Sequence, residues 1–356
     1  MLKMSIREER TMTIPVRGDA IADPAPAPAA MEELETVYER LRPLIPRAEW
    51  EAHAPVIAAI RAQKRQRRAV ILAHNYQAPE IFHAVADLTG DSLALAREAA
   101  AVDADVIVMC GVHFMAETAK LLNPSRLVLI PDPEAGCSLA SAITPGEIER
   151  LRRQYPGAPV VTYVNTSAAV KAASDICCTS ANAVEVVESL DADRVIFLPD
   201  EYLGRHVASR TDKELILWQG HCEVHEQFSA ADLVRCRREH PGVFILAHPE
   251  CPPDVLAEAD FTGSTADMIR EVDRRRPERV FLATEISMSR NLAAEFPGIR
   301  FIHPCHACPH MQRITLPGIL ECLRSLRHPV EVDPLVAARA RLAVERMLDI
   351  RVREKR

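Results

Sequence analysis

Aromatic residues, long apolar runs and a secretion signal are all scarce or absent in this sequence. Phe, Trp and Tyr make up only 4% of its 356 residues, so the cores must be built mainly from aliphatic side chains. No stretch approaches the roughly 20 consecutive apolar residues that a membrane-spanning helix requires. The first residues also lack the apolar segment of a signal peptide. We therefore expect a cytoplasmic protein with no membrane partner.

An excess of basic residues is lacking as well. The formal net charge is −7, and the basic runs Lys64–Arg68 and Arg274–Arg276 are short and isolated. Nucleic-acid binding needs clustered positive charge to neutralise phosphates, so we expect no nucleic-acid partner. Hydrophobic residues make up 48% of the chain and charged residues 26%, which is typical of folded domains. The length suits two or three of them.

Nine short apolar runs are typical of buried parallel strands, and they recur in matching order. The first strands of three units are expected at 70–73, 160–163 and 243–247, the second at 106–109, 195–198 and 280–283, and the third at 127–130, 215–218 and 299–302. Equivalent runs start 83 to 90 residues apart, and helical patterns separate them. This alternation predicts an α/β protein with three related three-layer αβα domains.

The repeat sets the expected domain boundaries. Residues 1–30 combine mixed charges with Pro-Ala repeats, a composition typical of a disordered tail. Helical spacing of apolar residues predicts N-terminal helices over 31–67. The α/β domains are expected at 68–142, 143–228 and 229–322, and a C-terminal helical segment at 323–356.

A second repeated segment lies between the first and second strands of each unit. Residues 86–92, 174–180 and 259–265 align without gaps, and each precedes a helical pattern. They end in hydroxyl residues, which are Ser92, Ser180 and Thr265. Helix capping explains one such hydroxyl. Three at equivalent positions also present three positive helix ends, which bind phosphate or carboxylate oxygens, so we expect an anionic substrate.

Three of the ten cysteines keep the register of the repeat. Cys137, Cys222 and Cys308 each follow the third strand of their unit, at separations of 85 and 86 residues. Equivalent positions in three related domains can converge on one axis, where thiolates would bind a soft metal centre. A cubane iron–sulfur cluster with three protein ligands would leave one iron open to substrate as a Lewis acid. A zinc site with three cysteines and a water has the same ligand count, and the spacing does not distinguish the two.

The other cysteines are not expected to bind metal. Cys305 forms a CxxC pair with Cys308, which could instead serve redox switching. Six cysteines break the register and are interpreted as structural: Cys110, Cys177, Cys178, Cys236, Cys251 and Cys322.

Polar residues follow the first strand of each unit, at the edge where α/β sheets bind ligands. They are His74 and Tyr76 in the first unit, Tyr163 and Asn165 in the second, and His248 and Glu250 in the third. Because His74 and His248 occupy equivalent positions, beside Tyr76 and Glu250, we expect these groups to act in acid/base chemistry or substrate binding.

Ten segments in the same order, between about residues 68 and 320, closely resemble the quinolinate synthase family. They are Ala73-His-Asn-Tyr-Gln, Gly90-Asp-Ser, Cys110-Gly-Val-His-Phe-Met-Ala-Glu-Thr-Ala-Lys, Ala135-Gly-Cys-Ser-Leu-Ala, Tyr163-Val-Asn-Thr-Ser-Ala-Ala-Val-Lys, Thr179-Ser-Ala-Asn-Ala, Pro199-Asp-Glu-Tyr-Leu-Gly, Trp218-Gln-Gly-His-Cys, His248-Pro-Glu-Cys and Gly263-Ser-Thr.

The resemblance implies a transferase of NAD (pyridine nucleotide) biosynthesis. Such an enzyme condenses iminoaspartate with dihydroxyacetone phosphate to give quinolinate, phosphate and water, and depends on an iminoaspartate-producing enzyme. The resemblance also implies a pseudo-threefold arrangement of the three αβα domains, with a [4Fe-4S] cluster at their junction.

The resemblance also implies roles for individual residues. The cluster ligands would be Cys137, Cys222 and Cys308. The substrate contacts would be His74, Ser92, Tyr163, Asn165, Ser180, His248, Glu250 and Thr265. The proton carriers would be His74, Tyr76, His248 and Glu250.

Two other classes of protein share parts of this pattern. A zinc-dependent lyase or hydrolase would use the same three-cysteine site, and metal analysis separates it from an iron–sulfur enzyme. A redox or iron-sensing module would use the cysteines, but it would not need the two histidines and three aligned hydroxyls.

Overall fold

The computed structural model describes residues 28–350. The N-terminal helices are the first elements of this range. Helix α1 (Pro28–Leu41) begins inside the predicted 1–30 tail, because proline is well suited to the first turn of a helix. The rest of that tail lies outside the described residues. Helix α2 (Arg47–Gln66) follows and leads into the first strand, as predicted. Across residues 28–350, none of the helices combines the length and apolar character needed to span a bilayer.

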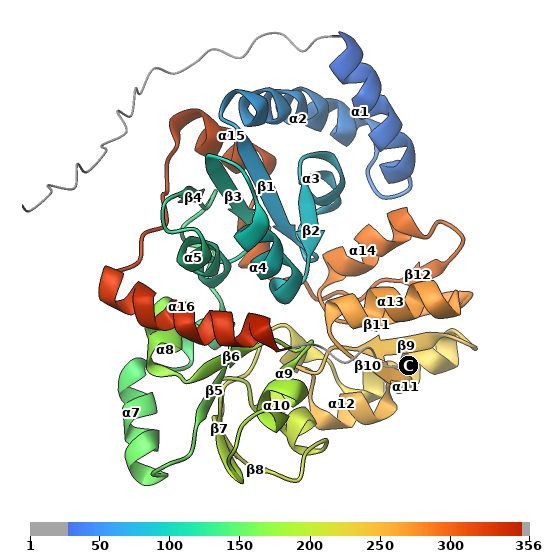
Figure 1. Ribbon diagram of the computed structural model, residues 1–356. Coiled ribbons are helices and arrows are strands. Elements are labelled where there is room, and N and C mark those ends of the chain that lie inside the picture. Colours follow the sequence, from blue (N-terminus) through green and yellow to red (C-terminus); the bar gives the residue numbers. More distant parts are fainter. Residues whose placement is uncertain (1–27, 351–356) are drawn as a thin grey trace, which may run out of the picture.

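Three four-stranded sheets organise the chain (Figure 1). The first contains β1 (Ala69–His74), β2 (Leu88–Gly90), β3 (Val106–Cys110) and β4 (Leu127–Leu129). The second contains β5 (Val160–Tyr163), β6 (Ile176–Cys178), β7 (Arg194–Leu198) and β8 (Glu214–Leu217). The third contains β9 (Phe244–Ala247), β10 (Phe261–Thr262), β11 (Arg279–Ala283) and β12 (Arg300–Ile302). The strand orders are equivalent: β2-β1-β3-β4, β6-β5-β7-β8 and β10-β9-β11-β12, with neighbours parallel.

The α/β fold class and all nine predicted strands are confirmed. A fourth strand in each sheet was not predicted, namely β2, β6 and β10. Each lies inside the repeated segment that precedes a predicted hydroxyl. These edge strands have only two or three residues, too few to show a period of two in the sequence.

Helices cover the sheets. Those of the first unit are α3 (Pro79–Ala84), α4 (Ser92–Ala101), α5 (His113–Leu122) and α6 (Ser138–Ser141). Those of the second are α7 (Pro145–Gln154), α8 (Ala168–Ala173), α9 (Ala183–Glu188), α10 (Glu201–Ala208) and the short η1 (His225–Gln227). The remainder are α11 (Ala230–Glu239), α12 (Pro253–Glu258), α13 (Thr265–Arg275), α14 (Ile286–Glu295), η2 (Met311–Arg313), α15 (Leu316–Ser325) and α16 (Pro334–Asp349).

The third sheet shows how alternation along a strand builds three layers. Side chains of Ile245 and Ala247 in β9 pack with residues of α11 and α12. Leu246 points to the opposite face and packs with residues of α13 and α14. Successive residues of a strand face opposite sides, so an uninterrupted apolar run such as this one is buried on both faces.

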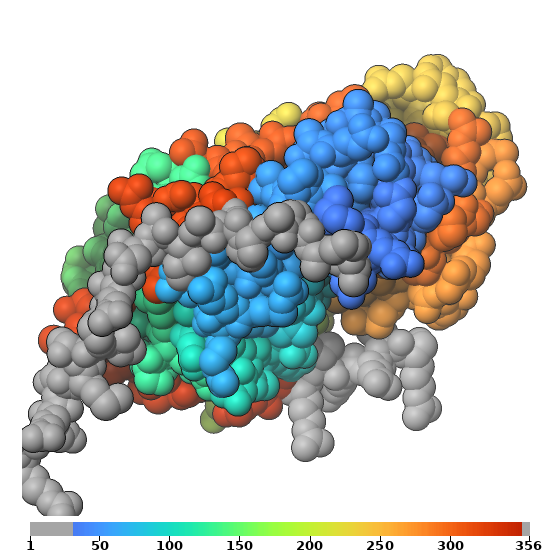
Figure 2. Space-filling model, turned by 90° about the horizontal axis from the view of Figure 1, so that it is seen from above, coloured from blue at the N-terminus to red at the C-terminus, as the bar shows by residue number. Residues whose placement is uncertain are grey.

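The last helices pack on earlier units. Helix α15 contacts α2 and β3 of the first unit, and α16 lies across α8, β6 and α5 (Figure 1). From above, the blue N-terminal helices lie beside orange and red C-terminal elements (Figure 2). The predicted boundary at residue 322 falls inside α15, because Leu323 continues the buried face of Ile319 and Leu320.

A repeated aspartate ties each sheet to the helix before it. Its carboxylate accepts a hydrogen bond from an amide of the first strand and pairs with a basic side chain of that helix. The three sets are Asp87 with the Ile71 amide (2.8 Å) and Lys64 (2.7 Å), Asp175 with the Val160 amide (2.7 Å) and Arg152 (2.8 Å), and Asp260 with the Ile245 amide (2.8 Å) and Arg237 (2.9 Å). These aspartates belong to the same repeated segment as the missed strands.

We predict that Asp175→Ala lowers the free energy of unfolding by about 1–3 kcal/mol, because it leaves the buried Val160 N–H without an acceptor. The pair with Arg152 is more than one-third exposed and adds little. Urea unfolding followed by circular dichroism measures the change. Asp191→Ala, at an exposed position before β7, is the control. Equal losses in the two variants would contradict the assignment.

Candidate functional site

One cavity in the described part of the chain collects every predicted site residue. Its walls include His74, Tyr76, Ser92, Cys137, Tyr163, Asn165, Ser180, Cys222, His248, Glu250, Thr265 and Cys308. They come from all three sheet-containing units. The volume of the cavity that is accessible to the centre of a water molecule is about 70 Å³. This is enough for several waters or a small ligand. The predicted residues thus lie together, while their individual roles remain predictions.

The two strand-end histidines have the same local geometry. The Nδ1 atom of His74 accepts a hydrogen bond from the Tyr76 amide at 3.2 Å, and that of His248 accepts one from the Glu250 amide at 3.3 Å. Burial lowers the pKa of His74 to about 4 and that of His248 to about 3, so both rings are neutral at neutral pH. With Nδ1 accepting, each ring carries its proton on Nε2 and can donate a hydrogen bond there.

Glu250 is a buried carboxylate held between donors. The Tyr163 hydroxyl donates to one oxygen at 2.6 Å, and Nδ1 of His225 lies 2.9 Å from the other. Burial by itself would raise the pKa of Glu250, but the imidazoles of His248 and His225 and these hydrogen bonds lower it below its ordinary value. Glu250 is therefore ionised at neutral pH and can accept a proton.

A chain of hydrogen bonds joins Tyr76 to Glu250. The Tyr76 hydroxyl lies 2.5 Å from Oγ1 of Thr284, which lies 2.9 Å from Nε2 of His225. His225 in turn contacts Glu250 through Nδ1. Burial raises the pKa of Tyr76, so its phenol stays protonated. The cavity thus places a neutral acid and an ionised carboxylate at the two ends of one polar chain.

The three register cysteines approach the cavity on separate segments. Cys137 precedes α6, Cys222 lies between β8 and η1, and Cys308 precedes η2. Burial raises the pKa of Cys137 to about 12, that of Cys308 to about 11, and that of Cys222 well above its ordinary range. They are therefore protonated thiols unless a bound cation deprotonates them. Three such thiols in one cavity are compatible with metal binding.

A tighter group of possible metal ligands lies beside Cys222. In the described residues, Cys222, His225 and Glu250 are the one set of three whose donor atoms all lie within 4.8 Å of one another. Hydrogen bonds already join its members, at 3.2 Å and 2.9 Å. Their closeness is thus explained without a metal, and we regard the three thiols as the better candidate ligands.

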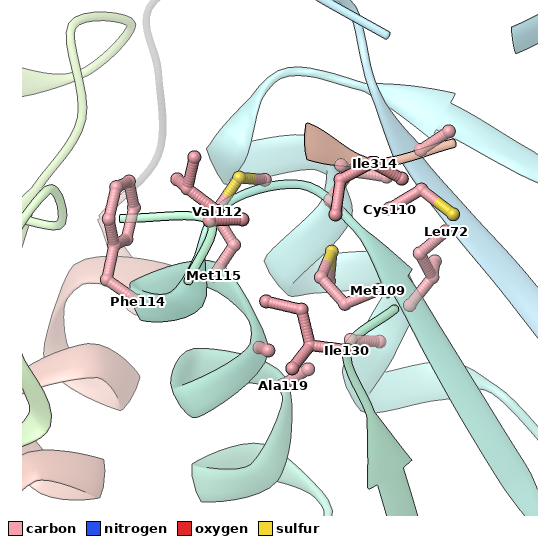
Figure 3. Close-up of a cluster of buried hydrophobic side chains, with 14 of the residues drawn as sticks. Leu72, Met109, Cys110, Val112, Phe114, Met115, Ala119, Ile130 and Ile314 are labelled. Carbon is pink, nitrogen blue, oxygen red and sulfur yellow. The ribbon is translucent and has the colours of Figure 1, made fainter. Parts of the chain in front are cut away.

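The six cysteines interpreted as structural are buried in hydrophobic clusters, and none is among the cavity residues. Figure 3 shows Cys110 between Leu72 and Ile314 in the largest core. Burial raises the pKa of this thiol well above its ordinary range. Cys110 therefore behaves as a small apolar side chain.

The predicted helix caps are wrong by one or two residues. Ser92 and Thr265 are the first residues of α4 and α13, whereas the caps are Asp91 and Ser264. The Asp91 carboxylate accepts a hydrogen bond from the Ala94 amide at 2.8 Å, a standard capping contact. Alignment of the repeats identifies equivalent positions but does not tell which of two adjacent polar residues is the cap.

Ser180 also differs from the prediction. Helix α9 has Asn182 at its N-cap, and the Asn182 side chain instead accepts a hydrogen bond from the Thr179 amide at 2.7 Å. Both Ser180 and Ser92 line the cavity without a hydrogen bond from their hydroxyls to the described residues. The buried Oδ1 atom of Asn165 also lacks a partner there. These groups are available to a ligand.

Several polar residues in and beside the cavity wall were not predicted as site residues. His225 lies three residues after Cys222 and lines the cavity. Glu285 follows β11 and also lines the cavity, whereas Thr284 is not a wall residue but contacts Tyr76 and His225. The prediction placed polar site residues only after the first strand of each unit. Glu285 accepts hydrogen bonds from the amides of Ser287 (2.7 Å) and Cys308 (3.3 Å), and burial raises its pKa to about 7.

The cavity wall has an uneven charge. Four carboxylates line it, from Asp91, Glu223, Glu250 and Glu285, but no lysine or arginine of the described residues does. An anionic ligand would therefore rely on hydroxyls, backbone amides and imidazoles for its hydrogen bonds.

Comparison with known proteins gives consistent matches over most of the chain. The profile of the family described as Quinolinate synthetase A protein matches residues 58–349. "Quinolinate synthase 2" of Mesorhizobium japonicum is 63% identical over 314 residues, which are 88% of this chain and 97% of the relative. The quinolinate synthase of Agrobacterium fabrum is 63% identical over 315 residues, covering 88% and 91%. That of Xylella fastidiosa strain 9a5c is 64% identical over 294 residues, covering 83% and 87%. The chain belongs to the quinolinate synthase family of enzymes.

Proposed function

We propose that this chain condenses iminoaspartate with dihydroxyacetone phosphate to give quinolinate, phosphate and water, a step of NAD biosynthesis. Its cofactor would be a [4Fe-4S] cluster bound by Cys137, Cys222 and Cys308. The observation that carries the proposal is the cavity itself, where three partly buried free thiols meet neutral imidazoles, phenols, hydroxyls and one ionised carboxylate. A redox or iron-sensing module would not require this set of polar groups.

Family membership favours a cluster over a single zinc ion. The resemblance to quinolinate synthases implies a [4Fe-4S] cluster, and the chain belongs to that family. A zinc ion would hold its thiolate sulfurs about 3.8 Å apart, given Zn–S bonds of about 2.3 Å in tetrahedral geometry. In a [4Fe-4S] cluster each thiolate binds a different iron, so the two centres differ in ligand spacing as well as in metal content.

The cluster is proposed to lie where three related units meet. Residues 68–142, 143–228 and 229–322 each supply one ligand and one sheet of the same strand order. The repeated aspartate contacts also support a common origin of these units. We infer a pseudo-threefold arrangement from these equivalences, with helices α1, α2, α15 and α16 added outside it.

Substrate anions are proposed to bind at the hydroxyl side of the cavity. When bound, a cluster with three protein ligands supplies a Lewis acid at its fourth iron. Ser92 and Thr265 stand in the first turns of α4 and α13, where amide groups favour negative charge. Ser180 adds a third hydroxyl, so phosphate and carboxylates can be held without a cationic side chain.

Proton transfer is assigned to the buried polar chain. Glu250 is ionised and can accept a proton from substrate carbon or nitrogen. Tyr76 is a protonated phenol that can donate to a departing hydroxyl or phosphate oxygen. The Nε2 protons of His74 and His248 are suited to orient substrate oxygens, because both rings are neutral.

The chemistry of the substrates implies a partner and a compartment. The imine of an amino acid hydrolyses readily in water, so an enzyme that produces iminoaspartate must supply it close in time and space. We place the reaction in the cytoplasm, whose reducing conditions keep cysteine ligands from forming disulfides.

The ligand assignment predicts which cysteines retain iron. Cys137→Ser, Cys222→Ser and Cys308→Ser should each lose most bound iron, because a cluster with two thiolates is weakly held. Cys110→Ser and Cys236→Ser are the controls and should keep it. Iron and sulfide are counted after anaerobic purification, together with the visible absorption spectrum. Zinc in the wild-type protein, or loss of iron in the Cys110 variant alone, would overturn the assignment.

Proton carriers should be needed for turnover but not for cluster binding. Glu250→Gln removes the basic carboxylate and Tyr76→Phe removes the acidic hydroxyl, while both preserve size. Each should lower the single-turnover rate by roughly 10²–10⁴-fold at unchanged iron content and melting temperature. Near-normal rates in both variants would remove these residues from the mechanism.

The cap correction gives a matched pair of variants. Ser92→Ala should raise the KM for the phosphate substrate while leaving stability unchanged, since its hydroxyl bonds to no described residue. Ser264→Ala should cost about 0.5–2 kcal/mol of stability, because it removes the cap of α13. Steady-state kinetics and urea unfolding compare the two. An unchanged KM in Ser92→Ala would exclude this hydroxyl from substrate binding.

A further inference from the structure

The loops that carry the three cysteines are joined to one another by residues that are not themselves cysteines. Four such residues adjoin the cysteines closely in sequence: Gly136 and Ser138 flank Cys137, Glu223 follows Cys222, and His310 lies two residues after Cys308. All four line the cavity. We call these four residues the loop-linking ring.

The first link joins the Cys137 loop to the Cys222 loop. Oγ of Ser138 accepts a hydrogen bond from the Glu223 amide at 3.1 Å. The same hydroxyl donates to the carbonyl oxygen of His221 at 3.2 Å. One serine beside a proposed ligand therefore contacts the backbone on both sides of the next ligand.

The second link joins the Cys222 loop to the Cys308 loop. Nε2 of His310 lies 2.8 Å from a carboxylate oxygen of Glu223. These side chains are 30% and 44% exposed, whereas those of His248 and Glu250 are 4% exposed. The His310–Glu223 contact therefore lies on the solvent side of the cavity.

The third link returns from the Cys308 loop to the Cys137 loop. The ring of His310 packs against Gly136, where a Cβ atom would lie 3.6 Å from its Cε1 and Nδ1 atoms. A reinforcing ion pair lies nearby, between Arg313 and Asp132 at 3.0 Å. His310 is thus the member of the ring that contacts both of the other loops through its side chain.

We propose that His310 is a positioning residue for the three-cysteine centre. By contacting Glu223 and Gly136 together, it closes a ring that holds the three loops in place without help from a metal. Loops held in this way lose less conformational freedom when a cluster binds, and the bound cluster is released more slowly. This inference rests on the proposed cluster, but it assigns a role to residues that are not ligands.

Iron release tests the role of the ring. Wild-type protein and the variants Glu223→Ala, His310→Ala and His310→Gln are loaded with cluster and mixed anaerobically with excess iron chelator. Glu223→Ala removes the acceptor for His310 and should speed release about two- to fivefold, the range for a partly exposed polar contact. His310→Ala should be faster still, because it loses both contacts. His310→Gln should be close to wild type, because its amide can still donate to Glu223.

The matched control is Glu226→Ala. Glu226 pairs with His221 at 3.2 Å, within the same loop, so it links no two loops. This variant should release iron at the wild-type rate. Melting temperatures should be equal in Glu223→Ala and Glu226→Ala, which separates loop positioning from general stability.

Thiol labelling of the metal-free protein gives a second readout. The ring predicts that Cys137, Cys222 and Cys308 react faster with a thiol reagent in Glu223→Ala and His310→Ala than in wild type, as followed by mass spectrometry of peptides. The exposed Cys305 should react equally in all proteins and serves as an internal reference.

The outcomes distinguish the two proposals. A wild-type protein that binds no iron would overturn the proposed cofactor and this inference with it. Wild-type protein that holds a cluster, with ring variants that release iron and label at wild-type rates, would overturn only the role of His310. Faster release in Glu226→Ala as well would also overturn it, since the effect would not depend on links between loops.

Discussion

Parallel strands end at one edge of their sheet, and the whole site depends on this constraint. Every neighbouring pair within the three sheets is parallel. The carboxyl ends of β1, β5 and β9 therefore bring His74, Tyr163 and His248, which end or follow these strands, to the same cavity. The segments after β4, β8 and β12 likewise bring Cys137, Cys222 and Cys308 to this cavity. The candidate ligand groups lie at the same cavity because each is placed at or after the carboxyl end of a parallel strand.

Much of this arrangement could be predicted from the sequence, since buried parallel strands are apolar on both faces and therefore read as uninterrupted runs. The candidate cysteines emerged because they recur at one place in the repeat. Residues without an equivalent in the other units were not predicted, and His225 and Thr284 are examples. The prediction of the helix caps was wrong because Asp91 and Ser92 are both polar. Only the backbone geometry distinguishes the N-cap residue from the first residue of the helix. Distances between loops of different units leave no trace in a single sequence.

Burial sets the charge of the cavity more than composition does. It keeps His74 and His248 neutral and Tyr76 protonated, and Glu250 is ionised only because its donors outweigh burial. Lys171 is fully buried with its ammonium group 5.3 Å from the centre of the Phe114 ring, so an aromatic wall residue lies next to its charge. Thiolates and substrate anions entering this space would be balanced by metal and by hydrogen-bond donors.

The position of α15 has a consequence for the order of folding during synthesis. The first sheet gains an antiparallel bridge from Pro329 to Leu129, and α15 covers β3 and α2. These contacts join residues 200 or more positions apart, and contacts of such long range form late. The unit that leaves the ribosome first is therefore the last to complete its core. Until the C-terminal helices are synthesised, the apolar surface of the first unit is exposed to solvent. In a chain truncated after the third sheet, this surface would stay exposed.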